Sequence, residues 1–378
     1  MTRRTWCIAA FTAGALAGCG GDEGGQGPVD EGEPPVVGCA DRTVEGALTR
    51  VCFPADWNGD LIVYAHGYVE PQAPLAVPEN EFGGTPVEDL VNALGYAYAT
   101  TSYRANGLIA DVAVDDVLEV VDLVRRTVRP DPARVYLVGV SEGGLVATLT
   151  AEREPERFTG ALAACGPIGD FVRQIDYIND VRVVFDVLFP GVLPGGAGDP
   201  PAELVEGWTS TYAPAVVAAI EADPGRGAEL AAVTGIPDAG IDTATLAGTV
   251  VALLRYNVLG TADALARLGG QPYDNADRVY VGSDDDEALN AGVERISADA
   301  AARAALERFE TTGDPGVTLS IIHTTGDPLV PFFHQSLYQE KAVAAGAAGR
   351  LARRDVERFG HCAFTTTEIL AAFGDLPQ

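Results

Sequence analysis

The 378-residue chain has few cations, few histidines and no long apolar run, and each shortage excludes a class of function. Lysine and arginine total 25 against 54 acidic residues, and only one cation is a lysine, Lys341. With a formal net charge of −29, the protein repels phosphate backbones, which excludes nucleic-acid partners. No apolar run reaches the roughly 18 residues that span a bilayer. With four histidines in all and no CxxC spacing, no metal site is expected.

The remaining composition is that of a folded protein. Hydrophobic residues make up 47% of the chain and the mean hydropathy is +0.11, which is too apolar for a disordered chain. The length fits two or three domains, or one large domain with an insertion. We therefore expect an acidic globular protein with a sizeable core.

The N-terminal segment has the pattern of an export signal. Arg3 and Arg4 precede an apolar stretch at 6–16, which is too short for a transmembrane helix. The stretch ends in Leu16-Ala17-Gly18-Cys19, which resembles a bacterial lipobox, and this resemblance implies a lipoprotein acylated on Cys19. We predict a signal peptide at 1–19 and a flexible tether at 20–37, which is rich in glycine and acidic residues.

The resemblance to bacterial lipoproteins also implies a location. The protein is expected to be exported to the cell envelope, facing the periplasm or the cell surface, with its lipid anchor as its only membrane contact. Gly20 rather than aspartate follows the lipobox cysteine, so the resemblance favours the outer membrane.

Cysteine usage agrees with export. After Cys7 and Cys19 are set aside, Cys39, Cys52, Cys165 and Cys362 remain, and four thiols in an oxidising compartment allow three connectivities. The first two lie thirteen residues apart and flank a short polar turn, so we pair them. That choice leaves Cys165 to pair with Cys362.

From about residue 44, short β-rich runs alternate with helical patterns, which predicts an α/β fold with a mostly parallel central sheet flanked by helices. The stretch 111–128 has the spacing of an amphipathic helix. The rhythm is interrupted between 166 and 315, where proline- and glycine-rich turns lead into alanine-rich helical segments, with one weak strand pattern at 278–281. We predict a core formed by 38–165 and 316–378 and a helical cap at 166–315. Strands are expected at 47–53, 61–65, 96–101, 135–140, 160–164, 318–323 and 350–356.

A GxSxG motif lies at the junction of a predicted strand and a predicted helix. Ser141 follows the strand 135–140 and is flanked by Gly139 and Gly143. In that setting the motif predicts a nucleophile elbow, a turn so tight that only glycine fits beside the serine.

A serine nucleophile needs a base and a group that orients the base. His361 lies in the loop after the last predicted strand, and Asp327 lies in the loop after the strand 318–323. The chain order Ser141, Asp327, His361 is the one expected of a nucleophile-elbow fold. Asp170, which follows the strand 160–164, is the alternative acid. Glu142 could tune acidity near the serine, or serve as a cap or brace.

The loop after the strand 61–65 contains His66, Gly67 and Tyr68. A glycine here lets the backbone approach the reacting carbonyl. The predicted oxyanion-hole donors are the backbone N–H groups of Tyr68 and Glu142. His66 is interpreted as a brace of this loop, and His323 and His334 as packing or surface residues.

Together these motifs resemble the α/β-hydrolase family over about 44–165 and 316–375. The resemblance implies Ser141 as nucleophile, His361 as general base and Asp327 as the residue that fixes its tautomer. It also implies that the pair Tyr103-Arg104 braces the oxyanion loop. We expect a lipid-anchored serine hydrolase that cleaves small carboxylic esters through an acyl-enzyme, without metal or cofactor.

Two other functions stay open. A serine peptidase of the same fold would need an anchor for the free amine of a short peptide, and a non-catalytic binding lipoprotein would need no triad. The candidate amine anchors are Asp170, Asp176, Asp180 and Asp186. Five aromatic residues of the cap either line an acyl pocket or pack in its core: Tyr177, Phe185, Phe189, Trp208 and Tyr212. The sequence makes no prediction of oligomeric state.

Overall fold

The computed structural model describes residues 35–378. The predicted signal peptide, the lipidation site Cys19 and nearly all of the predicted tether lie outside the described residues. Within residues 35–378, no helix combines the length and apolar character that a membrane crossing requires.

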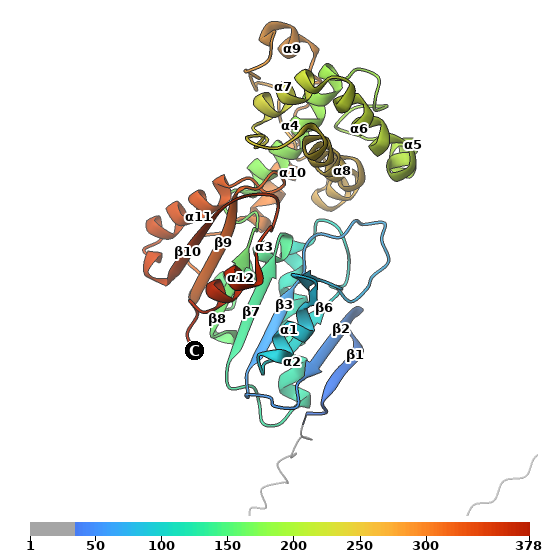
Figure 1. The fold of residues 1–378 in the computed structure, drawn as a ribbon. Coiled ribbons are helices and arrows are strands. Elements are labelled where there is room, and N and C mark those ends of the chain that lie inside the picture. The colour runs from blue at the N-terminus through green and yellow to red at the C-terminus, as the bar shows by residue number, and fades with distance from the viewer. Residues whose placement is uncertain (1–34) are drawn as a thin grey trace, which may run out of the picture.

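Residues 35–378 form ten strands and twelve α-helices, most of which are labelled in Figure 1. The strands are β1 Gly38–Val44, β2 Ala47–Phe53, β3 Leu61–Ala65, β4 Glu81–Phe82, β5 Thr85–Pro86, β6 Ala97–Thr101, β7 Val135–Val140, β8 Gly160–Ala164, β9 Thr318–Gly326 and β10 Leu351–Phe359. The helices are α1 Val87–Ala93, α2 Ala110–Thr127, α3 Glu142–Arg153, α4 Phe171–Leu188, α5 Ala202–Gly207, α6 Ala213–Ala222, α7 Pro224–Thr234, α8 Thr243–Leu268, α9 Asp286–Gly292, α10 Ala300–Ala305, α11 Phe333–Ala344 and α12 Thr366–Phe373.

Eight of the strands form one twisted sheet in the order β1-β2-β6-β3-β7-β8-β9-β10. β2 pairs antiparallel with β1 and β6, and every other pairing in this sheet is parallel. Parallel strands are covered on both faces, which explains the continuous apolar runs of β3 and β7. The predicted α/β fold class is confirmed.

Alternate residues of β3 divide between two cores, as the two-residue period of a strand requires. Leu61, Val63 and Ala65 pack with α2 and α3 on one face of the sheet. Ile62 and Tyr64 pack with α1 and α12 on the other face. The carboxyl ends of the parallel strands therefore share one edge of a rigid, covered sheet.

Between β8 and β9 the described chain forms helices and loops with a hydrophobic core of their own, around α4, α6, α7 and α8. In Figure 1 this helical body lies over the carboxyl edge of the sheet. The cap therefore covers the edge at which the strands deliver the predicted site residues.

The observed strands differ from the expected ones in several places. The stretch 278–281 forms no strand, because Val279 and Val281 are exposed and no neighbouring strand offers its backbone for pairing. β1 was not predicted, since its alternation of polar residues lies on an exposed edge and buries too little to leave an apolar pattern. β9 and β10 each run three residues beyond their predicted ends.

Candidate active site

Ser141 occupies a strained turn between β7 and α3. Its backbone has φ 58° and ψ −126°, in the left-handed half of conformational space that a side chain normally avoids. A Cβ on Gly139 would lie 1.9 Å from the carbonyl oxygen of Gly143, and one on Gly143 would lie 2.0 Å from that of Ala65. The turn therefore requires both glycines, and it presents the serine side chain at the carboxyl edge of the sheet.

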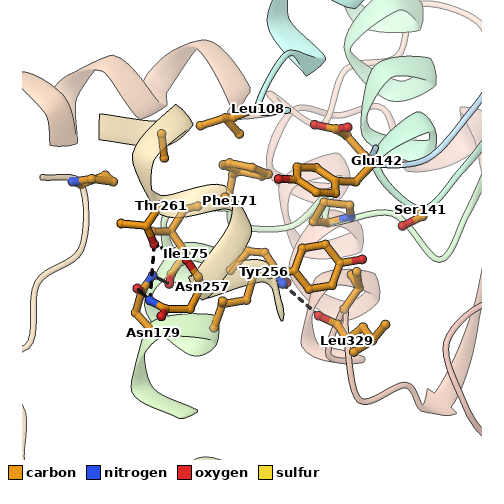
Figure 2. A pocket seen from close by; sticks show the side chains of 18 of the residues that line it. Leu108, Ser141, Glu142, Phe171, Ile175, Asn179, Tyr256, Asn257, Thr261 and Leu329 are labelled. Atoms are coloured by element: carbon orange, nitrogen blue, oxygen red, sulfur yellow. Dashed lines mark hydrogen bonds between the residues drawn. The ribbon is translucent and has the colours of Figure 1, made fainter. Parts of the chain in front are cut away.

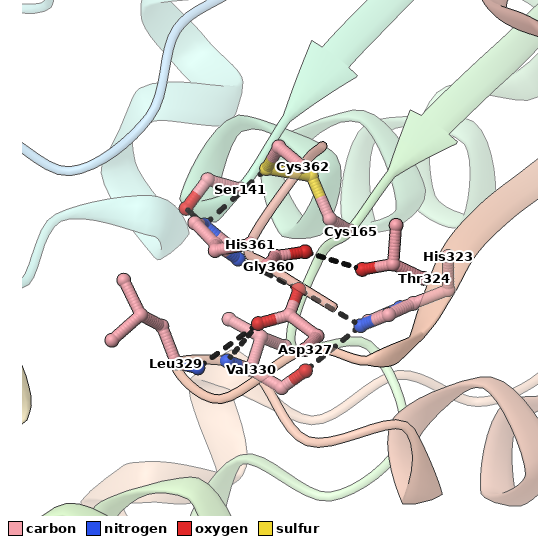
Figure 3. The surroundings of a disulfide bond; sticks show 10 residues. All are labelled: Ser141, Cys165, His323, Thr324, Asp327, Leu329, Val330, Gly360, His361 and Cys362. Atoms are coloured by element: carbon pink, nitrogen blue, oxygen red, sulfur yellow. Dashed lines mark hydrogen bonds and ion pairs between the residues drawn. A yellow bond between two sulfur atoms is a disulfide. The ribbon is translucent and has the colours of Figure 1, made fainter. Parts of the chain in front are cut away.

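Ser141, His361 and Asp327 are joined in one hydrogen-bonded row (Figure 3). His361 Nε2 lies 2.8 Å from the Ser141 hydroxyl oxygen, and His361 Nδ1 lies 2.7 Å from Asp327 Oδ2. These distances let Nδ1 donate to the carboxylate while Nε2 accepts the serine proton. The structure thus brings together three residues that the sequence separates by 186 and 34 positions.

Asp327 is fully buried at the end of β9, and its environment favours the charged form. Burial opposes ionisation, but the positive charge of His361 and hydrogen bonds from His323 and His361 hold the pKa of the carboxyl below its usual range. Its second oxygen, Oδ1, accepts the backbone N–H groups of Leu329 and Val330 at 2.9 and 3.0 Å. The carboxylate is fixed in place before substrate arrives.

His323 has a more specific place than the packing role inferred from sequence. Its Nε2 lies 2.8 Å from the Val330 carbonyl oxygen and 3.3 Å from Asp327 Oδ2. The ring is buried, and it contacts the same carboxylate oxygen, Oδ2, that faces His361. The spacing of four residues between His323 and Asp327 could have suggested a contact only if the strand were known to end between them.

The loop after β3 passes directly beside the serine. A Cβ on Gly67 would lie 3.1 Å from Cβ of Ser141. The Tyr103 hydroxyl donates to the His66 carbonyl at 3.1 Å, and the two rings stack 4.1 Å apart. The backbone N–H groups of Tyr68 and Glu142 have no acceptor among the described residues. Both are therefore free to bind a developing oxyanion.

Of the pair Tyr103-Arg104, which was expected to brace the oxyanion loop, only the tyrosine does so. Tyr103 supports the oxyanion loop, whereas Arg104 pairs with Asp116 of α2 at 2.7 Å. His66 keeps its Nδ1 on the Gly67 carbonyl oxygen at 2.7 Å, and burial lowers the pKa of its imidazole. His66 is thus part of the loop's support and lies apart from the hydrogen-bonded row.

Both disulfides have the pairing expected from the sequence. Cys39 and Cys52 are register partners in β1 and β2, and Cys165 is joined to Cys362. The second bridge ties the loop after β8 to the residue that follows His361, and the Cys362 sulfur lies 3.3 Å from His361 Nε2 (Figure 3). Within residues 35–378, Cys165, His361 and Cys362 are the one cluster with metal-ligand spacing, but its sulfurs form the disulfide.

The bridge beside His361 should affect catalysis as well as stability. The variant Cys165→Ala/Cys362→Ala is expected to lose about 2–5 kcal/mol of unfolding free energy and most of its kcat, because the histidine loop is then held only by weaker contacts. Urea unfolding and steady-state kinetics measure the two effects. The matched control is Cys39→Ala/Cys52→Ala, far from the site, which should lower stability with kcat retained. Equal kcat losses in the two variants would contradict the assigned role.

An apolar pocket extends from Ser141 between the sheet edge and the cap (Figure 2). Phe171, Ile175 and Ile178 of α4 form one wall, and Leu108 and Ala264 contribute further apolar surface. At the end distant from Ser141 lie the polar residues Asn179, Asn257 and Thr261. The cap thus supplies the surface that a substrate would contact, which sequence reasoning could not assign.

The five cap aromatics proposed as pocket residues do not line this pocket. Four are buried in the cap core and the fifth packs against it. Tyr177 additionally donates its hydroxyl to the Pro328 carbonyl at 2.6 Å, beside Asp327. Their spacing reflects the packing of α4 and its neighbours.

The alternative acid and the cap carboxylates have structural partners. Asp170 caps the N-terminus of α4 by accepting the Arg173 N–H at 2.8 Å. His334, buried beneath it, accepts the backbone N–H of Gly169 at 3.1 Å, and burial lowers the pKa of its imidazole. Ion pairs hold the three remaining carboxylates: Asp176 with Arg278 and Arg303, Asp180 with Arg278, and Asp186 with Arg182.

Glu142 is the only acidic residue among the described residues that line the pocket. Its side chain is buried, and this burial raises the pKa of the carboxyl to about 8, only partly offset by the backbone N–H of Ile109. The carboxyl is therefore uncharged at neutral pH in the folded protein. In the unfolded chain it ionises near its ordinary value of 4.5.

The raised pKa of Glu142 predicts a loss of stability with rising pH. Between about 4.5 and 8 the folded state holds a proton that the unfolded state releases, so the free energy of unfolding falls by roughly 1.4 kcal/mol per pH unit from this group and levels off above 8. Urea unfolding of the wild type and Glu142→Gln across this range should show a shallower decline in the variant. Parallel curves would contradict the assignment.

The prolyl oligopeptidase family matches residues 88–177, a segment that contains Ser141 but neither Asp327 nor His361. No curated protein matches the sequence of this chain. Similar solved structures include feruloyl esterase B from Aspergillus oryzae (13% identity, 86% of this chain and 73% of that chain covered, TM-score 0.44). Others are an esterase from Pyrococcus furiosus (12%, 90% and 95%, 0.42) and dipeptidyl peptidase 4 from Porphyromonas gingivalis (12%, 89% and 34%, 0.41).

The eight-stranded sheet, the elbow after β7 and the row of serine, histidine and aspartate define the class of this protein. It is a serine hydrolase with the α/β-hydrolase fold, as the sequence resemblance implies. Within that class, the substrate bond has to be argued from the site itself.

Proposed function

We propose that the protein is a carboxylic ester hydrolase that acts through an acyl-enzyme. Ser141 attacks the ester carbonyl while His361 takes its proton, and Asp327 stabilises the imidazolium that forms. The N–H groups of Tyr68 and Glu142 bind the oxyanion of the tetrahedral intermediate. His361 returns the proton to the departing alcohol. A water molecule, activated by the same histidine, then releases the acid and restores Ser141.

The observation that carries the ester proposal is the pocket beside Ser141. Its walls are largely apolar, and the cap carboxylates considered as anchors for a peptide amine are used in ion pairs or in a helix cap. An apolar acyl or alcohol group would bury its surface there, at about 25 cal/mol per Å². The site thus favours an ester over a short peptide held by those carboxylates.

We also propose that the protein is exported and lipid-anchored. The support is the lipobox-like sequence ending at Cys19 and the two disulfides, which are typical of an oxidising compartment. Labelling with a radioactive fatty acid in a bacterial host, compared between the wild type and Cys19→Ala, tests the anchor. Incorporation that persists in the variant would refute it.

The ester proposal is tested by comparing two classes of substrate. p-Nitrophenyl esters from acetyl to palmitoyl should be hydrolysed in a Ser141-dependent reaction, with the preferred chain length reporting the size of the pocket. Aminoacyl p-nitroanilides provide the competing reaction. A kcat/KM for the anilides that exceeds the value for the esters would replace the esterase by a peptidase of the same fold.

A further inference from the structure

The pocket has a polar group of side chains at its Ser141 end that the proposed mechanism does not use. The carboxyl of Glu142 and the hydroxyls of Tyr68 and Tyr256 belong to residues that line the same cavity as the nucleophile. Figure 2 shows Glu142 and Tyr256 on the side of the pocket near Ser141.

Glu142 is 7% exposed, yet no cation forms an ion pair with it within residues 35–378. The nearby Arg267 is held by Asp263 at 2.7 Å. The backbone N–H of Ile109 is the one hydrogen-bonding group that favours its charged form. A carboxyl can engage several donors, so most of its hydrogen-bonding capacity is unused.

The hydroxyls of Tyr68 and Tyr256 also have hydrogen-bonding capacity that is not used. Their rings contact each other, with centroids 5.2 Å apart, and neither hydroxyl has a hydrogen-bond partner in the described part of the chain. A Cβ on Gly260 of α8 would lie 3.0 Å from the Tyr68 hydroxyl, so the cap leaves just enough room for it. Burial raises the pKa of both phenols, and the charge of Glu142 adds to the effect. Both tyrosines line the same pocket as Glu142.

The opposite end of the pocket shows how this protein treats polar groups that are purely structural. Asn257 donates to Asn179 at 2.8 Å and to the Ala197 carbonyl at 2.9 Å, and it accepts from the buried Arg182. Thr261 donates to the Asn257 carbonyl at 2.6 Å. Buried polar groups are normally satisfied in this way, because leaving one unpaired costs roughly 1–3 kcal/mol. The polar atoms beside Ser141 differ from these: they are not among the buried atoms that lack a partner, so they keep access to the pocket and are available to a donor on a bound substrate.

We propose that Glu142, with the Tyr68 and Tyr256 hydroxyls, selects esters that carry a hydrogen-bond donor, a hydroxyl or an ammonium group, a few bonds from the reacting carbonyl. The inference rests on the proposed ester hydrolysis and names its substrate class. A donor at this position would satisfy acceptors that a plain alkyl ester leaves unpaired. The apolar wall beyond it would hold the rest of the substrate.

Two sets of matched esters test the proposal and show which half of the substrate bears the donor. In the acyl set, p-nitrophenyl 3-hydroxybutyrate is compared with the 3-methylbutyrate, and p-nitrophenyl β-alaninate with the butyrate. In the alcohol set, 2-hydroxyethyl and 2-aminoethyl butyrate are compared with propyl butyrate. In the wild type, kcat/KM should favour the donor-bearing member of at least one set by tenfold or more. Each set contains one hydroxyl ester and one amino ester, so the comparison also shows which of the two donor groups the site prefers.

The variants locate the cause of the preference. In Glu142→Leu the ratio should fall to near one, while Glu142→Gln, which keeps an acceptor oxygen, should retain part of it for the hydroxyl esters. Tyr68→Phe and Tyr256→Phe should each lower the ratio by a smaller factor. Phe171→Leu is the matched control, since it alters an apolar wall and should change both members of a pair alike.

Two outcomes would overturn the inference. One is a wild-type ratio near one in both sets. The other is a preference that survives unchanged in Glu142→Leu. In either case Ser141-dependent hydrolysis of butyrate esters would leave the proposed esterase standing. Absence of Ser141-dependent turnover on every ester would overturn both.

Discussion

Replacing Ser141 with alanine should lower kcat for p-nitrophenyl butyrate by a factor on the order of 10⁴ to 10⁶. The reason is the geometry of the elbow. The hydroxyl oxygen, 2.8 Å from His361 Nε2, is the one nucleophile held against the unoccupied N–H groups of Tyr68 and Glu142. Steady-state kinetics on the purified variant measure the loss. Circular dichroism and urea unfolding of the variant should match the wild type, since the fold is expected to persist.

Because Ser141 and His361 belong to one hydrogen-bonded row, we expect that the losses of kcat caused by replacing each of them will not add in the double variant. His361→Ala alone should cost about as much as Ser141→Ala, and the double variant should be no worse than either, because each change disables the same proton transfer. A fluorophosphonate should label the wild type on Ser141 and leave Ser141→Ala unlabelled. Labelling that persists in the alanine variant would show that another residue is the nucleophile. A loss in the double variant equal to the product of the single losses would show that Ser141 and His361 do not act as one unit.

The sequence was sufficient for the elements that carry the chemistry. β3, β7 and β8 have the predicted bounds, because buried parallel strands are short continuous apolar runs with sharp ends at glycine or a charged loop. Once the strands are known, chain order alone proposes Ser141, Asp327 and His361, since loops after parallel strands meet at one edge of the sheet. The structure confirms that the three side chains lie within hydrogen-bonding distance of one another in a row.

The residues that line the pocket could not be predicted from the sequence, for a physical reason. Its walls come from α4 and α8, and a helix pattern indicates which face is buried but not what that face contacts. Tyr177 and Tyr256 look alike in sequence, yet one packs beside the acid and the other lines the pocket. The support of Asp327 by His323, and the burial of Glu142 without a cationic partner in residues 35–378, depend likewise on distances between elements that no local pattern records.

Replacing Asp327 with asparagine should lower kcat by about 10⁴, even though the shape of the side chain is preserved. Oδ1 accepts two backbone N–H groups, from Leu329 and Val330, so the amide must keep its oxygen there. Its NH₂ group then replaces Oδ2, which faces His361 Nδ1 at 2.7 Å. Because an amide N–H can donate only to an unprotonated Nδ1, the imidazole proton moves to Nε2. In that tautomer His361 cannot accept the proton of Ser141.

The protonated nitrogen of His361 can be observed directly, so a loss of activity caused by the wrong tautomer can be distinguished from one caused by misfolding. Nitrogen NMR of the His361 ring should show Nδ1 protonated in the wild type and Nε2 protonated in Asp327→Asn at a pH where the ring is neutral. Asp170→Asn is the matched control, because asparagine caps a helix as well as aspartate does and the Asp170 side chain accepts only the Arg173 N–H within residues 35–378. Its kcat should stay within twofold of the wild type. A large loss in Asp170→Asn with activity retained in Asp327→Asn would transfer the role of the acid to the loop after β8.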